Sequence, residues 1–371
     1  MSAVGEDSRS FFRTMSPSAE PTMPDPWPPA LIPGEAIADE IDRLIDLDQP
    51  ADTRRASEIV HPQAPAHMQS MTPGLSVSIN VVRPGETVTI RRDNANGVEF
   101  CLSGSGAVAI GGSQFTVEKW SVWNRPTMQQ RRYTANGGEP LVWLSYSNAP
   151  LLNLLGVHYS DDAQGLVRGG GSNTAIEDKY QRVGAPDIQI LDAGARLRGY
   201  EFLVDIDVLD NRALHWPWAE VSPYLSQVLG DQKRTIMLMY NPLTERRAGT
   251  SNSFFATIQT IPGGADHPPP TSGHWHTSFA CNYHFRGSGR SIVGGKLYEW
   301  KAGDLMLSAP SWVEHAHGSS IEGSAILTIQ DHPFHISNGS LVWRESRDGP
   351  ILTLGAEEGQ RGYVGPRLAG S

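Results

Sequence analysis

Three histidines in the last third of the chain have the spacing of a metal site. His274 and His276 are two positions apart, and His315 follows beyond Pro310. Residues i and i+2 of a strand point to the same face, so His274 and His276 form two arms of a ligand set if that face lies inside a barrel. Three neutral imidazoles leave a divalent ion its full charge and open coordination positions on one side. The spacing therefore favours a reactive metal over a closed structural site.

The third ligand has two candidates. His317 follows His315 by two positions and lies on the same face of a strand, so either could close the set. We favour His315 as the ligand and His317 as a neighbour that tunes the site or relays protons. A lone His-x-His pair is weak evidence, because ordinary buried histidines more often explain it, and it is the downstream histidine, the glycine spacing and the barrel-like strand pattern that favour a metal. Imidazole suits Fe, Ni, Cu and Zn alike, so the residues leave the metal open.

An internal repeat indicates that these histidines belong to the second of two similar units. The Gly-Ser-Gly of residues 104–106 matches that of residues 287–289, and 287 minus 104 gives an offset of 183. The Gly-Gly pairs at 111–112 and 294–295 keep that offset. Short alternating runs meet Pro-Gly or Gly-Gly turns in each copy. We therefore expect an all-β protein with two jelly-roll barrels and a few peripheral helices.

The first copy does not repeat the histidines. At the same offset His274 and His276 correspond to Arg91 and Asp93, and at an offset of one more His315 corresponds to Arg131. These side chains make no comparable ligand set. We expect the first copy to be metal-free and to serve packing, dimerisation or covering of the second barrel.

Composition excludes several classes of protein. The 371 residues carry a formal net charge of -10, and no Lys/Arg run is long enough for a phosphate-binding stripe, so a nucleic-acid partner is not expected. No apolar run approaches the ~20 residues that span a bilayer, so no membrane partner is expected either. Cys101 and Cys281 are the only cysteines, which does not support a disulfide framework. We expect a cytoplasmic protein.

The motifs resemble those of a known family. The pattern of His274-x-His276, Gly287-x-Gly289, Gly303-Asp304, Pro310 and His315 is similar to the two motifs of the cupins, and the duplication makes the chain resemble a bicupin. It resembles the gentisate and salicylate 1,2-dioxygenases, which are ring-cleaving bicupins that hold Fe(II) on three histidines. The resemblance covers roughly residues 75 to 150 and 250 to 335.

Further site residues are implied by this resemblance alone. A Gln that precedes the His-x-His strand in that family matches Gln259, and the family's Trp-x-x-His-x-His segment matches residues 312–317, which implies His315 as ligand and His317 beside it. The Arg that holds the substrate carboxylate in the family is replaced by Asn282, which cannot form a bidentate charged pair. The family carries its metal in the first barrel, whereas here the histidines lie in the second.

The resemblance implies the organisation of the chain and its function. We expect an extended or disordered arm (1–33), a metal-free N-terminal cupin (34–155), a linker and cover segment (156–250), a metal-binding C-terminal cupin (251–345) and a tail (346–371). The implied activity is an Fe(II)-dependent dioxygenase that cleaves a hydroxylated aromatic ring with O2, with Mn, Ni or Zn as other metals. Dimers or tetramers are usual in the family. The alternatives are a non-oxidative metalloenzyme, such as an isomerase or hydrolase, and a binding bicupin without catalysis.

Overall fold

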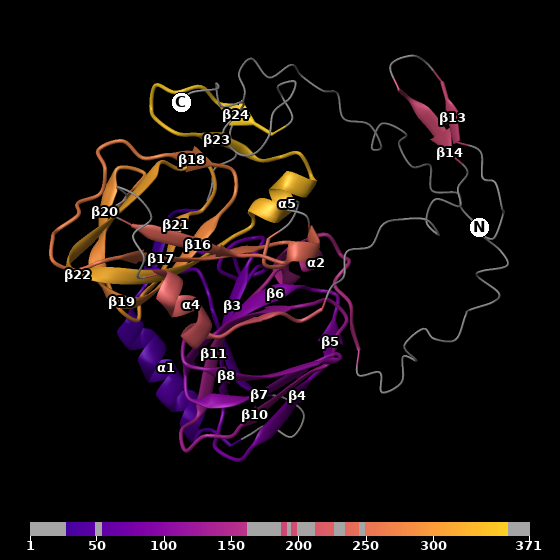
Figure 1. Ribbon diagram of the computed structural model, residues 1–371, viewed down its shortest axis with the longest axis vertical. Coiled ribbons are helices and arrows are strands. Elements are labelled where there is room, and N and C mark those ends of the chain that lie inside the picture. Colours follow the sequence, from indigo (N-terminus) through magenta and orange to yellow (C-terminus); the bar gives the residue numbers. More distant parts are fainter. Residues whose placement is uncertain are drawn as a thin grey trace, which may run out of the picture.

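Two β-rich domains pack side by side in the computed structural model (Figure 1), which describes residues 27–48, 54–161, 187–190, 194–198, 212–225, 234–244 and 249–354. The first domain is drawn in purple and magenta, and the second in orange and gold. Strands dominate both domains and the helices are short, as the sequence predicts. None of the helices in the described residues is long and apolar enough to cross a membrane.

The first domain is made of two sheets that face one another. Its larger sheet has the strand order β15-β9-β6-β11-β3-β2, and the smaller one has the order β4-β10-β7-β8. The strands are β2 (Arg55–Ile59), β3 (Ser76–Val82), β4 (Thr87–Ile90), β6 (Gly97–Ser103), β7 (Ser105–Ile110), β8 (Ser113–Glu118), β9 (Val122–Arg125), β10 (Arg131–Ala135), β11 (Leu141–Ser147) and β15 (His215–Trp216). A short pair, β5 (Arg92–Asp93) with β12 (Ser160–Asp161), lies at one edge of this domain.

The second domain has a similar arrangement. Its longest strands continue from one face of the barrel to the other. Its sheet has the order β1-β21-β19-β22-β17-β16, with β20 also paired to β19, and a small sheet has the order β18-β23-β24. The strands are β1 (Ala30–Ile32), β16 (Thr235–Met239), β17 (Phe255–Ile261), β18 (Trp275–His276), β19 (Ala280–Val293), β20 (Lys296–Lys301), β21 (Leu305–Ala309), β22 (His315–Gln330), β23 (Val342–Arg344) and β24 (Leu352–Thr353).

The repeated glycines occupy equivalent places in the two domains. Residues 111–112 form the two-residue turn between β7 and β8, and residues 294–295 form the same turn between β19 and β20. Gly104 and Gly287 both have a positive φ, of 74° and 71°. A Cβ on Gly104 would lie 2.2 Å from the carbonyl oxygen of Pro140, and one on Gly287 would lie 1.9 Å from that of Gly323. The structure thus confirms the duplication. It also explains why glycine recurs at these two positions, because a Cβ would clash there.

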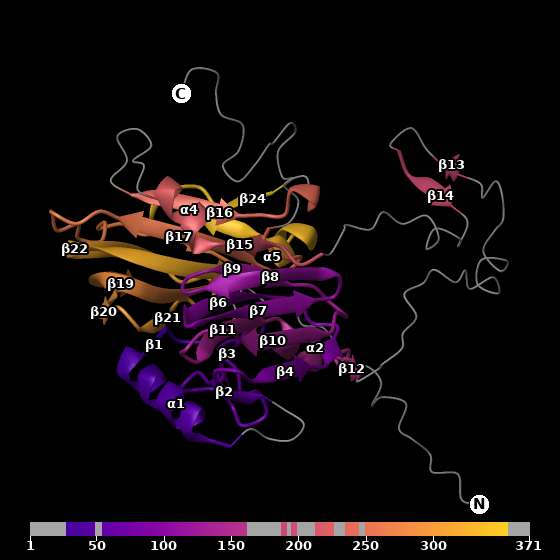
Figure 2. The ribbon, with the colours of Figure 1, turned by 60° about the horizontal axis from the view of Figure 1, so that its bottom comes forward.

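The main apolar core lies between the two domains. Alternate residues of β3, namely Val77, Ile79 and Val81, contribute to it from the first domain. The ring of Phe100 lies 5.9 Å from the ring of Tyr283, so aromatic side chains of both domains meet there. Figure 2 shows the strands of the two domains in successive layers, as this shared core requires. The two barrels are therefore held as one body by buried apolar surface.

The ends of the domains are tied together by peripheral elements. The helix α1 (Gly34–Asp46) is amphipathic and buries Ile37 and Leu44. The strand β1 pairs with β21 of the second domain, while residues 1–26 lie outside the described part of the chain. The remaining elements are α2 (Ala149–Leu154), β13 (Asp187–Gln189), β14 (Arg196–Arg198), α4 (Trp218–Leu225), the 3-10 helix η3 (Pro242–Thr244) and α5 (His332–Ser337).

Candidate metal centre

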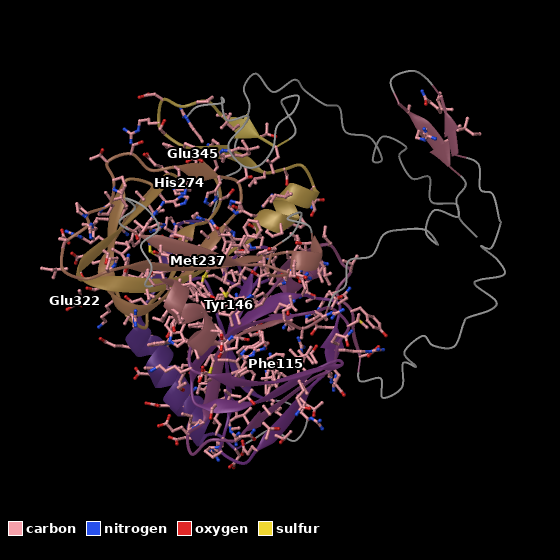
Figure 3. The ribbon with its side chains drawn as sticks, in the orientation of Figure 1. Phe115, Tyr146, Met237, His274, Glu322 and Glu345 are labelled. Carbon is pink, nitrogen blue, oxygen red and sulfur yellow. The ribbon has the colours of Figure 1, made fainter. Side chains whose placement is uncertain are left out.

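Two neighbouring chain segments of the second domain present the three histidines to one another. His276 lies in β18, His274 directly precedes that strand, and His315 begins β22. His274 and His315 stand opposite each other in an isolated antiparallel bridge, with both backbone N–H to O distances at 3.1 Å. Directly opposed residues share a face of a sheet, so this bridge brings the two imidazoles together. Figure 3 shows His274 in the second domain, on the side away from the labelled Phe115 of the first.

The three imidazoles form a compact triangle. One ring nitrogen from each of His274, His276 and His315 lies within 4.8 Å of the other two. His276 and His315 are each only 1% exposed, and His274 is partly buried. The three nitrogens form a group that could hold one metal ion, once small side-chain movements bring each of them to the usual distance of about 2.0–2.1 Å. The arrangement can hold a metal and leaves coordination positions that no fourth protein ligand of the described residues fills.

Backbone carbonyls orient two of these rings. Nδ1 of His276 lies 2.8 Å from the carbonyl oxygen of Ser278, and Nδ1 of His315 lies 2.9 Å from that of Val313. A carbonyl only accepts, so each Nδ1 carries the proton and donates it, which leaves Nε2 with its lone pair. Nε2 of His276 is buried and has no hydrogen-bond partner in the described residues. A buried acceptor without a partner is costly, and a metal ion at the triangle would satisfy it.

Burial keeps the three rings neutral. Desolvation, followed by the charge of His315, lowers the pKa of His274 to about 3. Desolvation likewise lowers the pKa of His315 to about 3 and the pKa of His276 well below its ordinary value. Neutral imidazole is the form that binds metal, so the lone pairs are available at neutral pH.

His317 lies beside the triangle and outside it. Its ring centroid is 5.7 Å from that of His315, and its Nδ1 lies 2.8 Å from Oγ of Ser291. Nε1 of Trp300 donates to the same Oγ at 2.9 Å. This arrangement fits the preference for His315 over His317 as the third ligand and leaves His317 as a neighbour held by Ser291.

Gln259 in β17 and Asn282 in β19 belong to the second barrel and form no hydrogen bond with the three imidazoles in the described residues. Gln259 stands opposite Ile326, a member of the apolar cluster inside the second barrel, so the two share that face. Asn282 is 3% exposed, and its Nδ2 donates to Oγ of Ser308 at 3.0 Å. The Oδ1 atom of Asn282 is buried without a partner in the described residues.

Several residues near the site were not found by sequence reasoning. Ser278 lies two positions after His276, and its Oγ lies 2.8 Å from Nδ1 of His332 at the start of α5. The charge of Arg234, an exposed residue just before β16, contributes to lowering the pKa of His274 and of His317. Arg234 is far from the histidines in the sequence and follows no motif, so only the folded chain could reveal it.

Another buried histidine lies deeper in the barrel. His284 is fully buried, and its ring stacks on Trp300 with centroids 4.0 Å apart. Its Nδ1 lies 3.2 Å from the carbonyl oxygen of Asp304. This histidine belongs to the packing beneath the site. The fold is that of a bicupin, and the three-histidine group found in the described residues lies in its second barrel.

Comparison with known proteins places the chain near one group of enzymes. No protein-family model matches it. It is 23% identical over 305 residues to 5-aminosalicylate 1,2-dioxygenase of a Comamonas species, covering 79% of this chain and 74% of that enzyme. It is 22% identical to gentisate 1,2-dioxygenase 1 of Aquipseudomonas alcaligenes, covering 76% of each. It is 24% identical to 1-hydroxy-2-naphthoate 1,2-dioxygenase of a Nocardioides species, covering 76% of this chain and 70% of the other.

A solved structure confirms the fold. Salicylate 1,2-dioxygenase from Pseudaminobacter salicylatoxidans superposes with a TM-score of 0.67 at 14% identity, covering 88% of this chain and 91% of the other. The chain therefore has the bicupin fold and resembles the gentisate and salicylate 1,2-dioxygenases, as the motifs predict.

Proposed function

We propose that this chain is a metal-dependent dioxygenase that cleaves a hydroxylated aromatic ring, with iron(II) held by His274, His276 and His315. The observation that carries the proposal is the triangle of imidazole nitrogens within 4.8 Å of one another. Support comes from the relatives, which are 1,2-dioxygenases of 5-aminosalicylate, gentisate and 1-hydroxy-2-naphthoate. Iron(II) held by these three neutral ligands would supply open coordination positions for a hydroxylated ring and for O2.

The side chains around the triangle would bind and orient the substrate. The buried Oδ1 of Asn282 lacks a partner in the described residues and can accept a hydrogen bond from a substrate hydroxyl. Gln259, on the same interior face as Ile326, can donate through its amide to an oxygen on the ring. Because Ser291 occupies Nδ1 of His317, Nε2 is the nitrogen through which His317 would take or return a proton.

Arg234 bears on the choice of substrate. Asn282 cannot pair with a carboxylate as a guanidinium does, which argues against carboxylated rings. The charge of Arg234, just before β16, nevertheless contributes to lowering the pKa of His274 and of His317, so this cation acts on the site. We therefore include carboxylated phenols such as gentisate, 5-aminosalicylate and 1-hydroxy-2-naphthoate among the candidate substrates. A cytoplasmic location and a dimeric or tetrameric assembly are part of the same proposal.

The test is oxygen consumption by metal-loaded protein. Protein loaded anaerobically with Fe(II) is mixed with gentisate, salicylate, 5-aminosalicylate, 1-hydroxy-2-naphthoate and hydroquinone, and O2 uptake is followed together with loss of the aromatic absorbance. We expect one or more of these to be consumed with matched O2 stoichiometry. No uptake with any of them, in protein shown to contain iron, would contradict the proposal.

The histidine assignment is tested separately by metal analysis. His276→Ala should lose bound metal and activity together, because the triangle then lacks one of its two fully buried ligands. His67→Ala, at an exposed position, is the matched control and should keep both. Protein that binds Mn, Ni or Zn stoichiometrically and consumes no O2 would instead favour the non-oxidative alternative.

A further inference from the structure

The first barrel contains a cavity of its own, at the end where β5 and β12 pair. It has a volume of about 290 Å³. Its lining includes Arg54, Asp93, Arg125 and Arg131 from the barrel wall and His158 from the segment before β12. His158 is exposed, which places it at the rim, whereas Arg125 and Arg131 are 6% and 3% exposed and lie inside. The cavity is thus a pocket with guanidinium groups in its interior.

The cavity occupies the place that the metal triangle occupies in the second barrel. Asp93 corresponds to His276 at the offset of 183, and Arg131 corresponds to His315 at the offset of 184; both pairs are in contact. Nη2 of Arg131 lies 2.7 Å from Oδ2 of Asp93. The same two positions of the scaffold therefore carry neutral metal ligands in one barrel and an ion pair in the other. A pocket built this way repels a cation and has no set of imidazoles to hold one.

The positive charges in this pocket exceed the carboxylates available to them. Asp93 pairs closely with Arg131 and lies 4.0 Å from Arg125, so one carboxylate serves two guanidiniums. The Nε atoms of Arg125 and Arg131 are buried and have no hydrogen-bond partner in the described residues. Burial, followed by the charge of Arg131, lowers the pKa of Arg125 to about 10. Buried charge without a counter-charge is unfavourable, so this pocket favours an anion.

Two further carboxylates near the pocket do not restore the balance. Glu99 is 2% exposed and already accepts hydrogen bonds from Trp123 Nε1, Tyr133 Oη and Ser145 Oγ. Glu58 also lines the pocket, and burial raises its pKa, which disfavours its charged form. Arg54 adds a third guanidinium to the lining.

We propose that the first barrel binds a small organic carboxylate at this cavity. Arginine forks match the two oxygens of a carboxylate, and the hydroxyls of Ser76, Ser78 and Ser147 in the lining supply further donors. Ile90 and Ala149 add apolar surface, and the volume exceeds what a lone inorganic ion fills, so an acid with an organic body fits better than phosphate. The inference is independent of the reaction at the second barrel.

Calorimetric titration of the full, metal-loaded chain tests the proposal. The probes are benzoate, succinate and inorganic phosphate, with benzamide as an uncharged analogue of benzoate. We expect benzoate or succinate to bind and benzamide not to bind. No carboxylate binding at millimolar concentration, or binding by phosphate alone, would overturn the proposal.

Variants separate the two barrels. Arg125→Met removes a guanidinium while Asp93 keeps its close partner Arg131, so the fold should be retained. It should weaken carboxylate binding at least tenfold, and Arg131→Lys, which keeps the charge and loses the fork, should weaken it as well. Arg132→Met is the matched control, because Arg132 is exposed on the other face of the same strand.

The metal site provides the remaining control. His276→Ala lies in the other barrel, so it should leave binding in the first barrel unchanged. Binding that is lost in His276→Ala and retained in Arg125→Met would place the anion at the metal centre and overturn the proposal. Failure of the dioxygenase assay would not affect this result, because no turnover is measured.

Discussion

Ser278 connects His276 to His332. Its Oγ lies 2.9 Å from Nδ1 of His276 and 2.8 Å from Nδ1 of His332, and its backbone carbonyl oxygen lies 2.8 Å from the same Nδ1 of His276. Nδ1–H of His276 donates towards Ser278, and the serine hydroxyl can then donate to His332, whose pKa is lowered to about 3 by burial. The ring of His276 is therefore fixed from behind by two oxygens of one residue.

Ser278→Ala tests this support. The substitution removes the hydroxyl and keeps the carbonyl, so His276 should hold its tautomer with less restraint on its ring. We expect metal affinity to fall about tenfold, at the low end of the effects of groups that orient metal ligands. Competition with a chelator of known affinity measures the change. Thr277→Val is the control, because the Thr277 hydroxyl bonds Ser340 and Val342 instead; equal affinities in the two variants would contradict the role of Ser278.

His317→Gln tests the separation between metal binding and proton transfer. His317 lies outside the triangle, so the variant should retain stoichiometric metal. If Nε2 of His317 moves a proton during turnover, kcat should fall about 10²-fold or more while KM changes little. Metal analysis and steady-state oxygen uptake measure the two effects. Loss of metal in this variant would show that His317 is a ligand after all.

His284 should make the stability of the protein depend on pH. Burial lowers the pKa of His284 to about 3 in the folded state, against 6.5 as its ordinary value. Between these values the unfolded chain binds a proton that the folded chain does not, so the free energy of unfolding falls as the pH drops. From pH 7.5 to pH 5.5, we expect this one group to account for a loss of about 1.4 kcal/mol.

The contribution of His284 is measured by substitution. Urea unfolding of His284→Gln at both pH values should show a loss smaller by that amount than in the unsubstituted protein. His67→Gln, at an exposed position, controls for removal of a histidine. Equal losses in His284→Gln and in the unsubstituted protein would contradict the prediction.

Gly287→Ala should be strongly destabilising. The residue has a φ of 71°, and its added Cβ would lie 1.9 Å from the carbonyl oxygen of Gly323, so β19 and β22 would have to separate locally. We expect a loss of about 3 kcal/mol or more in the free energy of unfolding. Gly295→Ala is the matched control: its φ is 78°, but its Cβ would meet open space, so the loss should be about 1 kcal/mol. Urea unfolding compares the two, and similar losses would refute the steric explanation.

The sequence by itself determined the duplicated fold and the location of the histidine centre. Gly104 and Gly287 recur because the backbone of a neighbouring segment in each barrel leaves no room for a Cβ. Such a local steric requirement is visible in the residue type. His274 and His276 share a face because the side chains of a strand alternate, which is also a local rule. The family resemblance followed from these motifs.

Only the tertiary structure decided which groups surround each site. The bridge between His274 and His315 brings these two residues together, and the charge of Arg234, just before β16, contributes to lowering the pKa of His274. For the first barrel, the sequence showed only that the metal-binding histidines are absent. The structure shows that Arg125 and Arg131 share the carboxylate of Asp93 in a cavity. Charge balance and burial depend on distances between residues far apart in the chain, and those distances exist only once the barrels have folded.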